Sequence, residues 1–384
     1  MSIPLDRLYN FVDSLGGGDI VIYRFLPHGS KKITDLSRLR FVTNSEWSSA
    51  TRMICHDQEP LNHELYADPS VIDQLLDKNP DYFLSHYSQK LIPWLTARNL
   101  KLGTDTYCCN RDWALLLHSE KHSPQLDLYQ QSGFLPVYWW SHAIIARDWF
   151  RYAKHDPALR IKHPNHDFLI YNRAWQGTRE YRLKFAELVV DHDLQDRCNM
   201  SFNAYDMDQH YGHHQYAREA FSVTTKLEDY FEPNTHDATA SADYDTHDYE
   251  HSAMEVVLET LFDDVRWHLT EKTLRPLACA QPFILAATAG SLQYTREYGF
   301  QTFAPLIDET YDTITDPVAR LQAIVQEMRR IADLPHNQKK KLFEDLHTIA
   351  LANQLHFFSD DFHQQVVSEL QTNLAQARDQ LLSI

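Results

Sequence analysis

The 384-residue sequence contains little glycine and no glycine-rich phosphate motif. Its ten glycines form no GxGxxG, GxxxxGK[ST] or GxSxG pattern, so the usual signatures of dinucleotide enzymes, P-loop ATPases and serine hydrolases are missing. Cysteine is also scarce. The chain has five cysteines, which are scattered and form no CxxC motif. This argues against a disulfide framework and a cysteine zinc site, and it favours a reducing cytoplasm.

Long apolar runs are missing as well. No segment approaches the roughly 20 apolar residues that span a bilayer, and the first residues, MSIPLD, lack the basic and apolar regions of a signal peptide. We therefore expect no membrane partner. Hydrophobic residues make up 43% of the chain and charged residues 23%, a composition typical of globular proteins, and the length is sufficient for two domains.

Positive charge is absent from one long stretch. Residues 227–265 contain twelve Asp or Glu residues and no Lys or Arg, so the rest of the chain carries only −5 of the net charge of −17. That remainder is nearly balanced and has room for a local basic groove. Net charge therefore does not exclude a nucleic-acid partner.

Short β-rich apolar runs alternate with amphipathic stretches, which is typical of an α/β protein. The expected strands are residues 19–26, 52–56, 82–86, 114–118, 134–139, 168–171, 200–202 and 282–286. The expected helices are residues 144–152, 180–190, 252–264, 270–279, 290–298 and most of 317–384, whereas residues 234–251 are expected to form a polar, acidic loop.

Turn-rich sequence near residue 160 divides these elements into two α/β sets. We expect an N-terminal α/β domain over residues 1–160, a second α/β domain over 161–350 and a helical tail over 351–384. Ligands of open α/β sheets bind beyond the carboxyl ends of the strands. The cleft between two such domains is therefore the expected binding site.

The segment Thr270-Glu271-Lys272 begins an expected helix that precedes a buried strand. A lysine at this place can neutralise a diphosphate, and a glutamate can accept hydrogen bonds from ribose hydroxyls. Arg275 lies on the same helical face, four residues after Glu271, and is a possible ion-pair partner. The alternative is an ordinary solvated first turn in which Thr270 or Glu271 caps the helix.

Arginines follow the expected strand 168–171. Asn172-Arg173 comes directly after it, and Arg179 and Arg182 lie three residues apart at the start of the next helix. Guanidinium groups bind phosphate oxygens in a bidentate way that lysine does not match. The alternative is a surface helix whose arginines pair with neighbouring glutamates.

Together these two segments, within residues 165–310, resemble the donor-binding domain of fucosyltransferase-like glycosyltransferases. The shared pattern is a strand, Asn-Arg, a further arginine before a helix, a TEKxxR helix, an apolar strand and a Gly-Ser turn. The resemblance implies a GT-B fold, which has two facing Rossmann-like domains, and a nucleotide-diphosphate sugar as donor substrate with no tightly bound cofactor. The donor contacts that it implies are Arg173 (or Arg179), Glu271 and Lys272. We predict Asn172, Arg275 and Ser291, which belong to the same segments, as further donor-binding residues.

Residues 55–60, 115–123 and 136–156 are similar to segments of tailed-phage proteins in this glycosyltransferase group. Some of those proteins are encoded beside genes that make hydroxymethylated and then glycosylated DNA bases. The resemblance implies sugar transfer to the hydroxymethyl group of a modified cytosine in double-stranded phage DNA, within the host cytoplasm. Two alternatives stay open: transfer to a cell-surface polysaccharide, and a non-catalytic protein that binds nucleic acid or another partner.

Glycosyl transfer needs a base near the acceptor hydroxyl and counter-charge for the departing nucleotide diphosphate. Asp57 and Glu59 follow an expected strand, where a loop can face the cleft, so we predict them as catalytic residues. His56 and His142 are competing bases. In the structural alternative, Asp57 caps a turn before Pro60.

Two short segments, WWSH (139–142) and RDW (147–149), are expected to form an aromatic and basic patch. For a nucleobase acceptor, we predict that the base stacks on Trp139 or Trp140 and that Arg147 or Arg151 contacts backbone phosphates. His142 is a further predicted acceptor contact. The alternative places these aromatic side chains in the core.

We predict no metal site. Residues 206–208 and 243–245 match the DxD pattern of metal-dependent glycosyltransferases, but such triplets are common by chance in an acid-rich chain. Histidines 210, 213 and 214 lie close together without a carboxylate or cysteine at ligand spacing, so a surface cluster is the favoured interpretation.

Overall fold

The computed structural model describes residues 20–24, 51–55, 101–102, 105–106, 114–124, 126–131, 134–231 and 243–383. The chain divides into two compact units. Ala146–Gln364 lie in one of them, and Ile3–Ile145 form the other together with Gln365–Ile384. The expected strand 82–86 and the predicted catalytic residues Asp57 and Glu59 lie outside the described residues. No helix in the described ranges is both long enough and apolar enough to span a bilayer.

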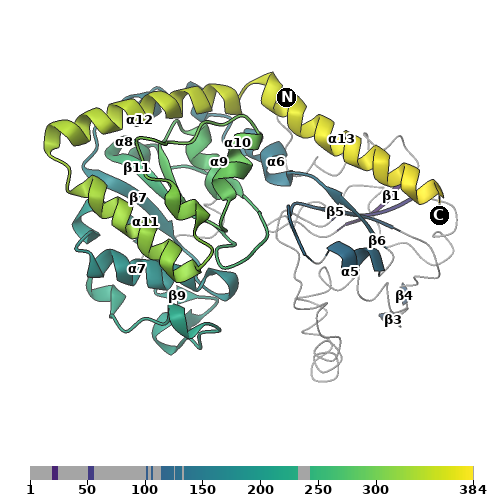
Figure 1. Ribbon diagram of the computed structural model, residues 1–384, viewed down its shortest axis with the longest axis horizontal. Coiled ribbons are helices and arrows are strands. Elements are labelled where there is room, and N and C mark those ends of the chain that lie inside the picture. Colours follow the sequence, from purple (N-terminus) through teal and green to yellow (C-terminus); the bar gives the residue numbers. More distant parts are fainter. Residues whose placement is uncertain are drawn as a thin grey trace. The chain divides into compact units, whose positions relative to one another are not determined.

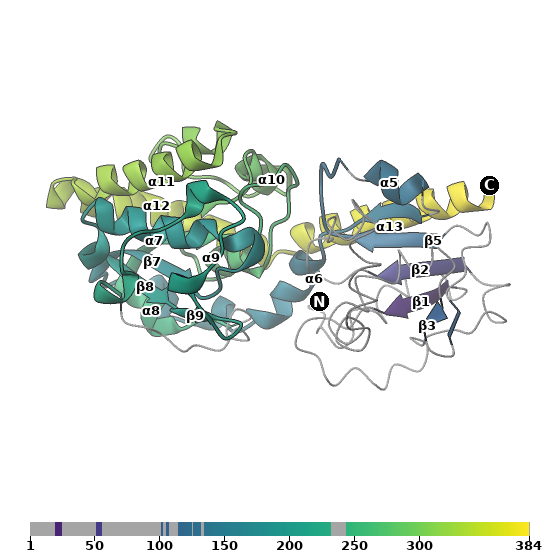
Figure 2. The same cartoon turned by 90° about the horizontal axis from the view of Figure 1, so that it is seen from below.

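The unit that contains the N-terminal half is built on a parallel four-stranded sheet (Figures 1 and 2). Its strands, in spatial order, are β1 (Ile20–Arg24), β2 (Thr51–Cys55), β5 (Ala114–His118) and β6 (Phe134–Tyr138). The unit also contains the short antiparallel pair β3 (Lys101–Leu102) and β4 (Asp105–Thr106), helix α5 (Leu126–Gln131) and the start of helix α6 (Ser141–Trp149). The strands predicted at 19–26, 52–56, 114–118 and 134–139 are confirmed.

Most of the last helix, α13 (Asp360–Ser383), belongs to this same unit. Asn373 Nδ2 donates a hydrogen bond of 2.9 Å to the carbonyl oxygen of Tyr138, at the end of β6. One face of the helix is buried at helical spacing, through Val366, Leu370 and Leu374. The end of the chain therefore contributes to the core of the unit that its beginning forms.

The second unit contains another parallel sheet, formed by β7 (His166–Asn172), β8 (Cys198–Phe202), β11 (Ser252–Leu258) and β12 (Phe283–Ala286). Their spatial order is β12-β11-β7-β8. The chain moves outward from β7 to β8 and then returns to the other side of β7 for β11 and β12. The strand order therefore reverses between β7 and β11, which is the switch point of a doubly wound sheet.

Helices lie on both faces of this second sheet. Asn172 Nδ2 bonds to the first turn of α7, whereas the hydroxyl of the preceding Tyr171 bonds to Asp248 in α8, because successive strand side chains point to opposite faces. The helices are α7 (Tyr181–Asp191), α8 (Thr246–His251), α9 (Glu271–Ala278), α10 (Ser291–Glu297), α11 (Pro317–Ala332) and α12 (His336–Phe357), and a small hairpin joins β9 (Tyr205–Asp206) to β10 (Gln209–His210). The helices predicted at 180–190, 270–279 and 290–298 and the helical C-terminal region are confirmed.

The helix predicted over residues 252–264 is wrong, because its first seven residues form β11. Every residue of β11 is buried, so both faces of the strand are covered, and its sequence SAMEVVL lacks a regular alternation of apolar and polar residues. Periodicity alone does not distinguish such a run from a buried helix. The loop predicted over residues 234–251 is also corrected at its end, where α8 begins behind an N-cap: the Asp245 carboxylate accepts a hydrogen bond from His247 N at 2.9 Å.

Candidate functional site

Two loops leave the second sheet at its switch point. Residues 173–180 follow β7 and lead into α7, and residues 259–270 follow β11 and lead into α9. We call these the switch-point loops. Ligands of doubly wound sheets bind beyond the strand ends at such a place. Five of the seven predicted donor contacts lie within these loops or within two residues of them: Asn172, Arg173, Arg179, Glu271 and Lys272. Arg275 lies farther along α9, and Ser291 begins α10.

The first switch-point loop has a defined shape because the β9–β10 hairpin and the second loop both bind it. Trp175 N and Gln176 N donate to the same oxygen, Asp206 Oδ2, at 2.7 and 2.8 Å. Thr178 Oγ1 donates to the carbonyl oxygen of Thr260 at 2.9 Å, which joins the two loops directly. Asp206, the first acid of one DxD triplet, is therefore engaged in stabilising this loop.

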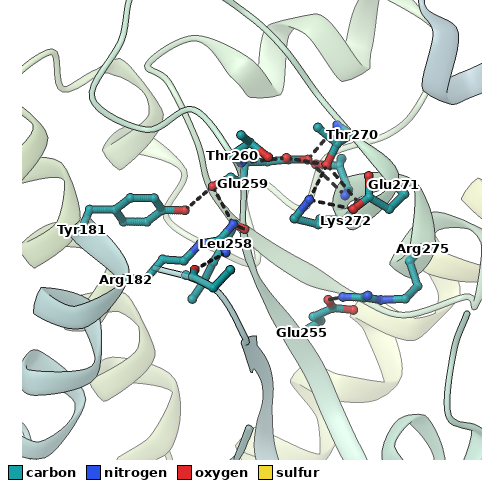
Figure 3. A network of polar contacts seen from close by, with 12 residues as sticks. Tyr181, Arg182, Glu255, Leu258, Glu259, Thr260, Thr270, Glu271, Lys272 and Arg275 are labelled. Atoms are coloured by element: carbon teal, nitrogen blue, oxygen red, sulfur yellow. Dashed lines mark hydrogen bonds and ion pairs between the residues drawn. The ribbon is translucent and has the colours of Figure 1, made fainter. Parts of the chain in front are cut away.

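The first residues of α7 bind the end of β11 (Figure 3). Tyr181 Oη donates to the carbonyl oxygen of Glu259 at 2.7 Å, and Arg182 Nη2 donates to the carbonyl oxygens of Leu258 and Glu259 at 2.6 and 3.0 Å. Asn172 Nδ2 in turn donates to the carbonyl oxygen of Arg182 at 2.9 Å. Asn172, a predicted donor contact, is thus a buried part of the junction between β7, α7 and β11.

Arg173 is a half-buried cation without a carboxylate partner among the described residues. Its guanidinium carbon lies 4.4 Å from the centre of the Tyr171 ring, and its Nε and Nη1 atoms are buried and have no hydrogen-bond partner in that part of the chain. Burial lowers the pKa of Arg173, and the charge of Arg275 lowers it further. A buried donor without an acceptor is unfavourable, so an anionic ligand at this position would stabilise the arginine.

Arg275 differs from Arg173, because its charge is neutralised inside the protein. Its Nη2 lies 2.7 Å from Glu255 Oε1, in an ion pair that is almost completely buried. Its Nε donates to Tyr249 Oη at 2.9 Å, and that hydroxyl donates to Glu255 Oε2 at 2.6 Å. Arg275 also stacks on the Tyr171 ring, 4.4 Å from its centre. The ring therefore contacts two guanidinium groups, one internally paired and one not.

Glu259, the first residue after β11, organises the start of α9. Its side chain is fully buried. Oε1 accepts hydrogen bonds from Thr270 N, Thr273 N and Thr273 Oγ1 at 3.0, 3.2 and 2.5 Å. Oε2 accepts from Thr270 Oγ1 at 2.8 Å and from Thr260 N at 3.2 Å. One internal carboxylate therefore stabilises the positive end of the α9 dipole.

Lys272 and Glu271 lie in the first turn of α9 (Figure 3). Lys272 Nζ donates to Glu271 Oε1 at 2.7 Å and to Thr270 Oγ1 at 3.2 Å. An ammonium group has three donors, so one remains after these two contacts with described residues. The lysine side chain is 21% exposed, whereas that of Glu271 is 9% exposed.

The remaining two predicted donor contacts are placed differently. Arg179 Nε donates to the carbonyl oxygen of Gln176 at 3.2 Å, within the first switch-point loop. Ser291 is buried at the start of α10, and its Oγ donates to the carbonyl oxygen of Thr288 at 2.6 Å. Arg179 therefore lies with Arg173 at the loop, whereas the Ser291 hydroxyl completes the turn after β12.

The turn between β12 and α10 is tightly built. Gly290 has a φ of +85°, and a Cβ atom there would lie 2.7 Å from the Trp267 ring. Asp312 accepts a hydrogen bond from Leu292 N at 3.1 Å. Burial raises the pKa of the Asp312 carboxyl to about 6. The turn is therefore part of the folded framework, and Asp312 is its one carboxyl group with a raised pKa.

The residues predicted to contact an acceptor lie in the interior. Trp139, Trp140 and His142 are at most 1% exposed. Arg147, farther along α6, donates to the carbonyl oxygens of residues 357–359 at 2.5–3.2 Å and so caps the end of α12. Stacking on a nucleobase requires an accessible ring face, so this structure gives the predicted acceptor patch no support.

The close histidines contact different carboxylates. His214 Nε2 lies 2.7 Å from Glu180 Oε1, and His210 Nε2 lies 3.1 Å from Glu228 Oε1. Within the described ranges, no three His, Cys, Asp or Glu side chains are grouped so that they could hold a metal ion.

Sequence reasoning missed Glu259 and the role of Thr270 as its partner. A signal was present, because an acid directly after a buried strand and a threonine at a helix start are both common capping elements. The Thr270 signal was used, and the alternative in which Thr270 caps the helix is confirmed, because its Oγ1 accepts a hydrogen bond from Lys272 N at 3.3 Å. The Glu259 signal could not be used while residues 252–264 were expected to be helical. Comparisons with protein-family models, curated proteins and solved structures found no match, so the site's chemistry rests on its own geometry.

Proposed function

We propose that the protein is a glycosyltransferase that binds a nucleotide-diphosphate sugar at the switch-point loops. The observation that carries this proposal is the pair of cations there: Arg173 with two unpartnered buried nitrogen atoms, and Lys272 with one remaining ammonium donor. The two residues come from adjoining elements, because Arg173 shares the Tyr171 ring with Arg275, which lies three residues after Lys272. Two adjacent phosphates fit two cations of which Arg173 is presented by the loop after β7 and Lys272 by the first turn of α9.

A GT-B arrangement of two Rossmann-like domains is part of the proposal. Two features support it: each unit contains a parallel four-stranded sheet, and residues 365–384 return to the unit formed by residues 3–145. The catalytic base stays predicted at Asp57 or Glu59. We leave three residues out of the proposed ligand contacts, because Arg275 pairs with Glu255, the Asn172 amide nitrogen donates to Arg182 and the Ser291 hydroxyl donates to Thr288. The Asn172 Oδ1 atom is buried without a partner among the described residues, but it is an acceptor and does not donate to a phosphate.

The donor side can be tested by calorimetric titration with UDP, GDP, their sugars and inorganic pyrophosphate. We expect binding of at least one nucleotide, and a loss of affinity of about tenfold or more in Lys272→Ala, because a charged hydrogen bond is removed. Lys341→Ala is the matched control, since Lys341 also pairs with a neighbouring acid, Asp345 at 2.6 Å, but lies exposed on α12. Wild-type protein that binds none of these compounds would contradict the proposal.

For the acceptor, we propose the hydroxymethyl group of a modified cytosine in phage DNA. The support is the resemblance of residues 55–60, 115–123 and 136–156 to phage proteins of this group. The experiment is incubation with hydroxymethylcytosine duplex and a panel of nucleotide sugars, read by mass spectrometry of the nucleosides. A mass gain on the nucleoside supports DNA as acceptor, and a gain only on glycan acceptors supports the polysaccharide alternative.

A further inference from the structure

The amide groups at the start of α9 are already occupied by internal acceptors. Thr270 N and Thr273 N donate to Glu259, and Lys272 N donates to Thr270 Oγ1 at 3.3 Å. Glu259 is fully buried, so a ligand cannot easily displace it. A phosphate at this helix would therefore be bound through side chains and not through these amides, although helix N-termini often bind phosphate.

The Thr270 hydroxyl connects the buried carboxylate to the lysine (Figure 3). A hydroxyl has one proton and two acceptor sites. Its proton is donated to Glu259 Oε2 at 2.8 Å, so its lone pairs face Lys272, whose Nζ lies 3.2 Å away. Glu271 Oε1, at 2.7 Å, fixes a second direction of the ammonium group.

We infer that Thr270, oriented by Glu259, is a positioning residue that directs the Lys272 ammonium toward the anionic part of the ligand. The inference rests on the proposed function, because it requires a ligand phosphate at Lys272. A lysine held in its binding position loses less conformational freedom when the ligand arrives. Thr270 therefore contributes to affinity without touching the ligand.

Thr273 provides a matched control for this role. Its hydroxyl also donates to Glu259, at 2.5 Å, and its side chain is buried on the same helix, but none of its hydrogen bonds involves Lys272. Thr270→Val and Thr273→Val each remove one hydroxyl from the same carboxylate. We expect both variants to lower the midpoint of urea unfolding.

Only the Thr270 variant should change ligand binding. We expect Thr270→Val to raise the Kd for pyrophosphate, UDP or GDP about five- to tenfold, in the range of one hydrogen bond, and Thr273→Val to change it less than about twofold. Thr270→Ser retains the hydroxyl and should bind like the wild type. In a Lys272→Ala background, Thr270→Val should have no further effect, because its action passes through the lysine.

The outcomes separate this inference from the proposed function. Equal weakening by the two valine variants, or a Thr270→Val effect that persists without Lys272, overturns the positioning role. Binding that depends on Lys272 but not on Thr270 overturns the positioning role and leaves the proposed donor site intact. Absence of binding in the wild type overturns both.

Discussion

At the scale of single residues, two neighbouring arginines of the second unit differ in whether an internal carboxylate pairs with them. Arg275 and Glu255 neutralise each other, and Tyr249 bonds to both. Arg173 lies against the same Tyr171 ring but has two buried nitrogen atoms without partners in the described ranges. Arg275 is therefore neutralised within the protein, whereas Arg173 is the arginine that we propose for the anionic ligand.

Removal of Arg275 should destabilise the fold strongly. We expect Arg275→Met to lower the free energy of unfolding by about 3–5 kcal/mol, because Glu255 is left buried without its partner. The exposed pair of Lys341 with Asp345, at 2.6 Å, supplies the control, and Lys341→Ala should cost less than about 1 kcal/mol. Urea unfolding measures both values. Equal losses in the two variants would contradict this account of the buried pair.

Asp312 should make stability depend on pH. Its pKa is raised from 3.8 to about 6 by burial, so the folded state binds the proton more tightly than the unfolded state does. The contribution of Asp312 to the free energy of unfolding is fully present below about pH 4. It decreases by up to about 3 kcal/mol as the pH rises through 6. Asp312→Asn should remove that decrease. Urea unfolding near pH 4 and pH 7 tests this, and an unchanged pH profile in the variant would refute it.

At the scale of elements, the turn between β12 and α10 depends on one glycine. Gly290 has a left-handed backbone, and the Trp267 ring occupies the space where a Cβ would lie. Gly177 also has a positive φ, of +65°, but nothing lies within 4 Å of its Cβ position. A comparison of alanine substitutions at the two glycines therefore distinguishes the cost of a left-handed backbone from the cost of steric overlap with Trp267.

Gly290→Ala should be more damaging than Gly177→Ala. We expect the second to cost about 1–2 kcal/mol of unfolding free energy, from the left-handed backbone alone. The first should cost about 2–5 kcal/mol, because overpacking against Trp267 is added. Denaturant unfolding compares the two, and equal costs would show that the tryptophan moves aside without penalty.

The buried face of α13 gives a second test at this scale. Leu370 is fully buried, whereas Leu355 on α12 is 71% exposed. Leu370→Ala should lower the free energy of unfolding by about 2–5 kcal/mol through the cavity it leaves. Leu355→Ala should change it by less than about 0.5 kcal/mol. A small effect at Leu370 would mean that α13 contributes little to the N-terminal unit.

Most elements could be predicted from the sequence because short apolar runs bounded by turns mark parallel strands. β11 could not, since its seven buried residues carry no alternation that separates a strand from a buried helix. The burial of Trp139 could not be predicted either, because aromatic side chains that stack on a nucleobase and those that pack in a core are the same residue types. The same holds for the role of Arg147. Arg147 finds its carbonyl partners more than two hundred residues away, at residues 357–359.

At the scale of the whole molecule, the candidate site depends on strand order. The sequence placed Arg173 and Lys272 in separate segments, each beside an expected strand. It did not show that β7 and β11 are neighbours, a relation that joins residues more than eighty positions apart. Glu259 was missed for a different reason, because residues 252–264 were expected to be helical and β11 was not recognised as a strand that ends beside the start of α9.

The most direct test of the central claim is a crystal structure of the protein with bound UDP or GDP. We expect the two phosphates beyond the carboxyl ends of β7 and β11, within hydrogen-bond distance of Lys272 Nζ and the Arg173 guanidinium. Phosphates bound elsewhere, with both cations unchanged, would contradict the claim.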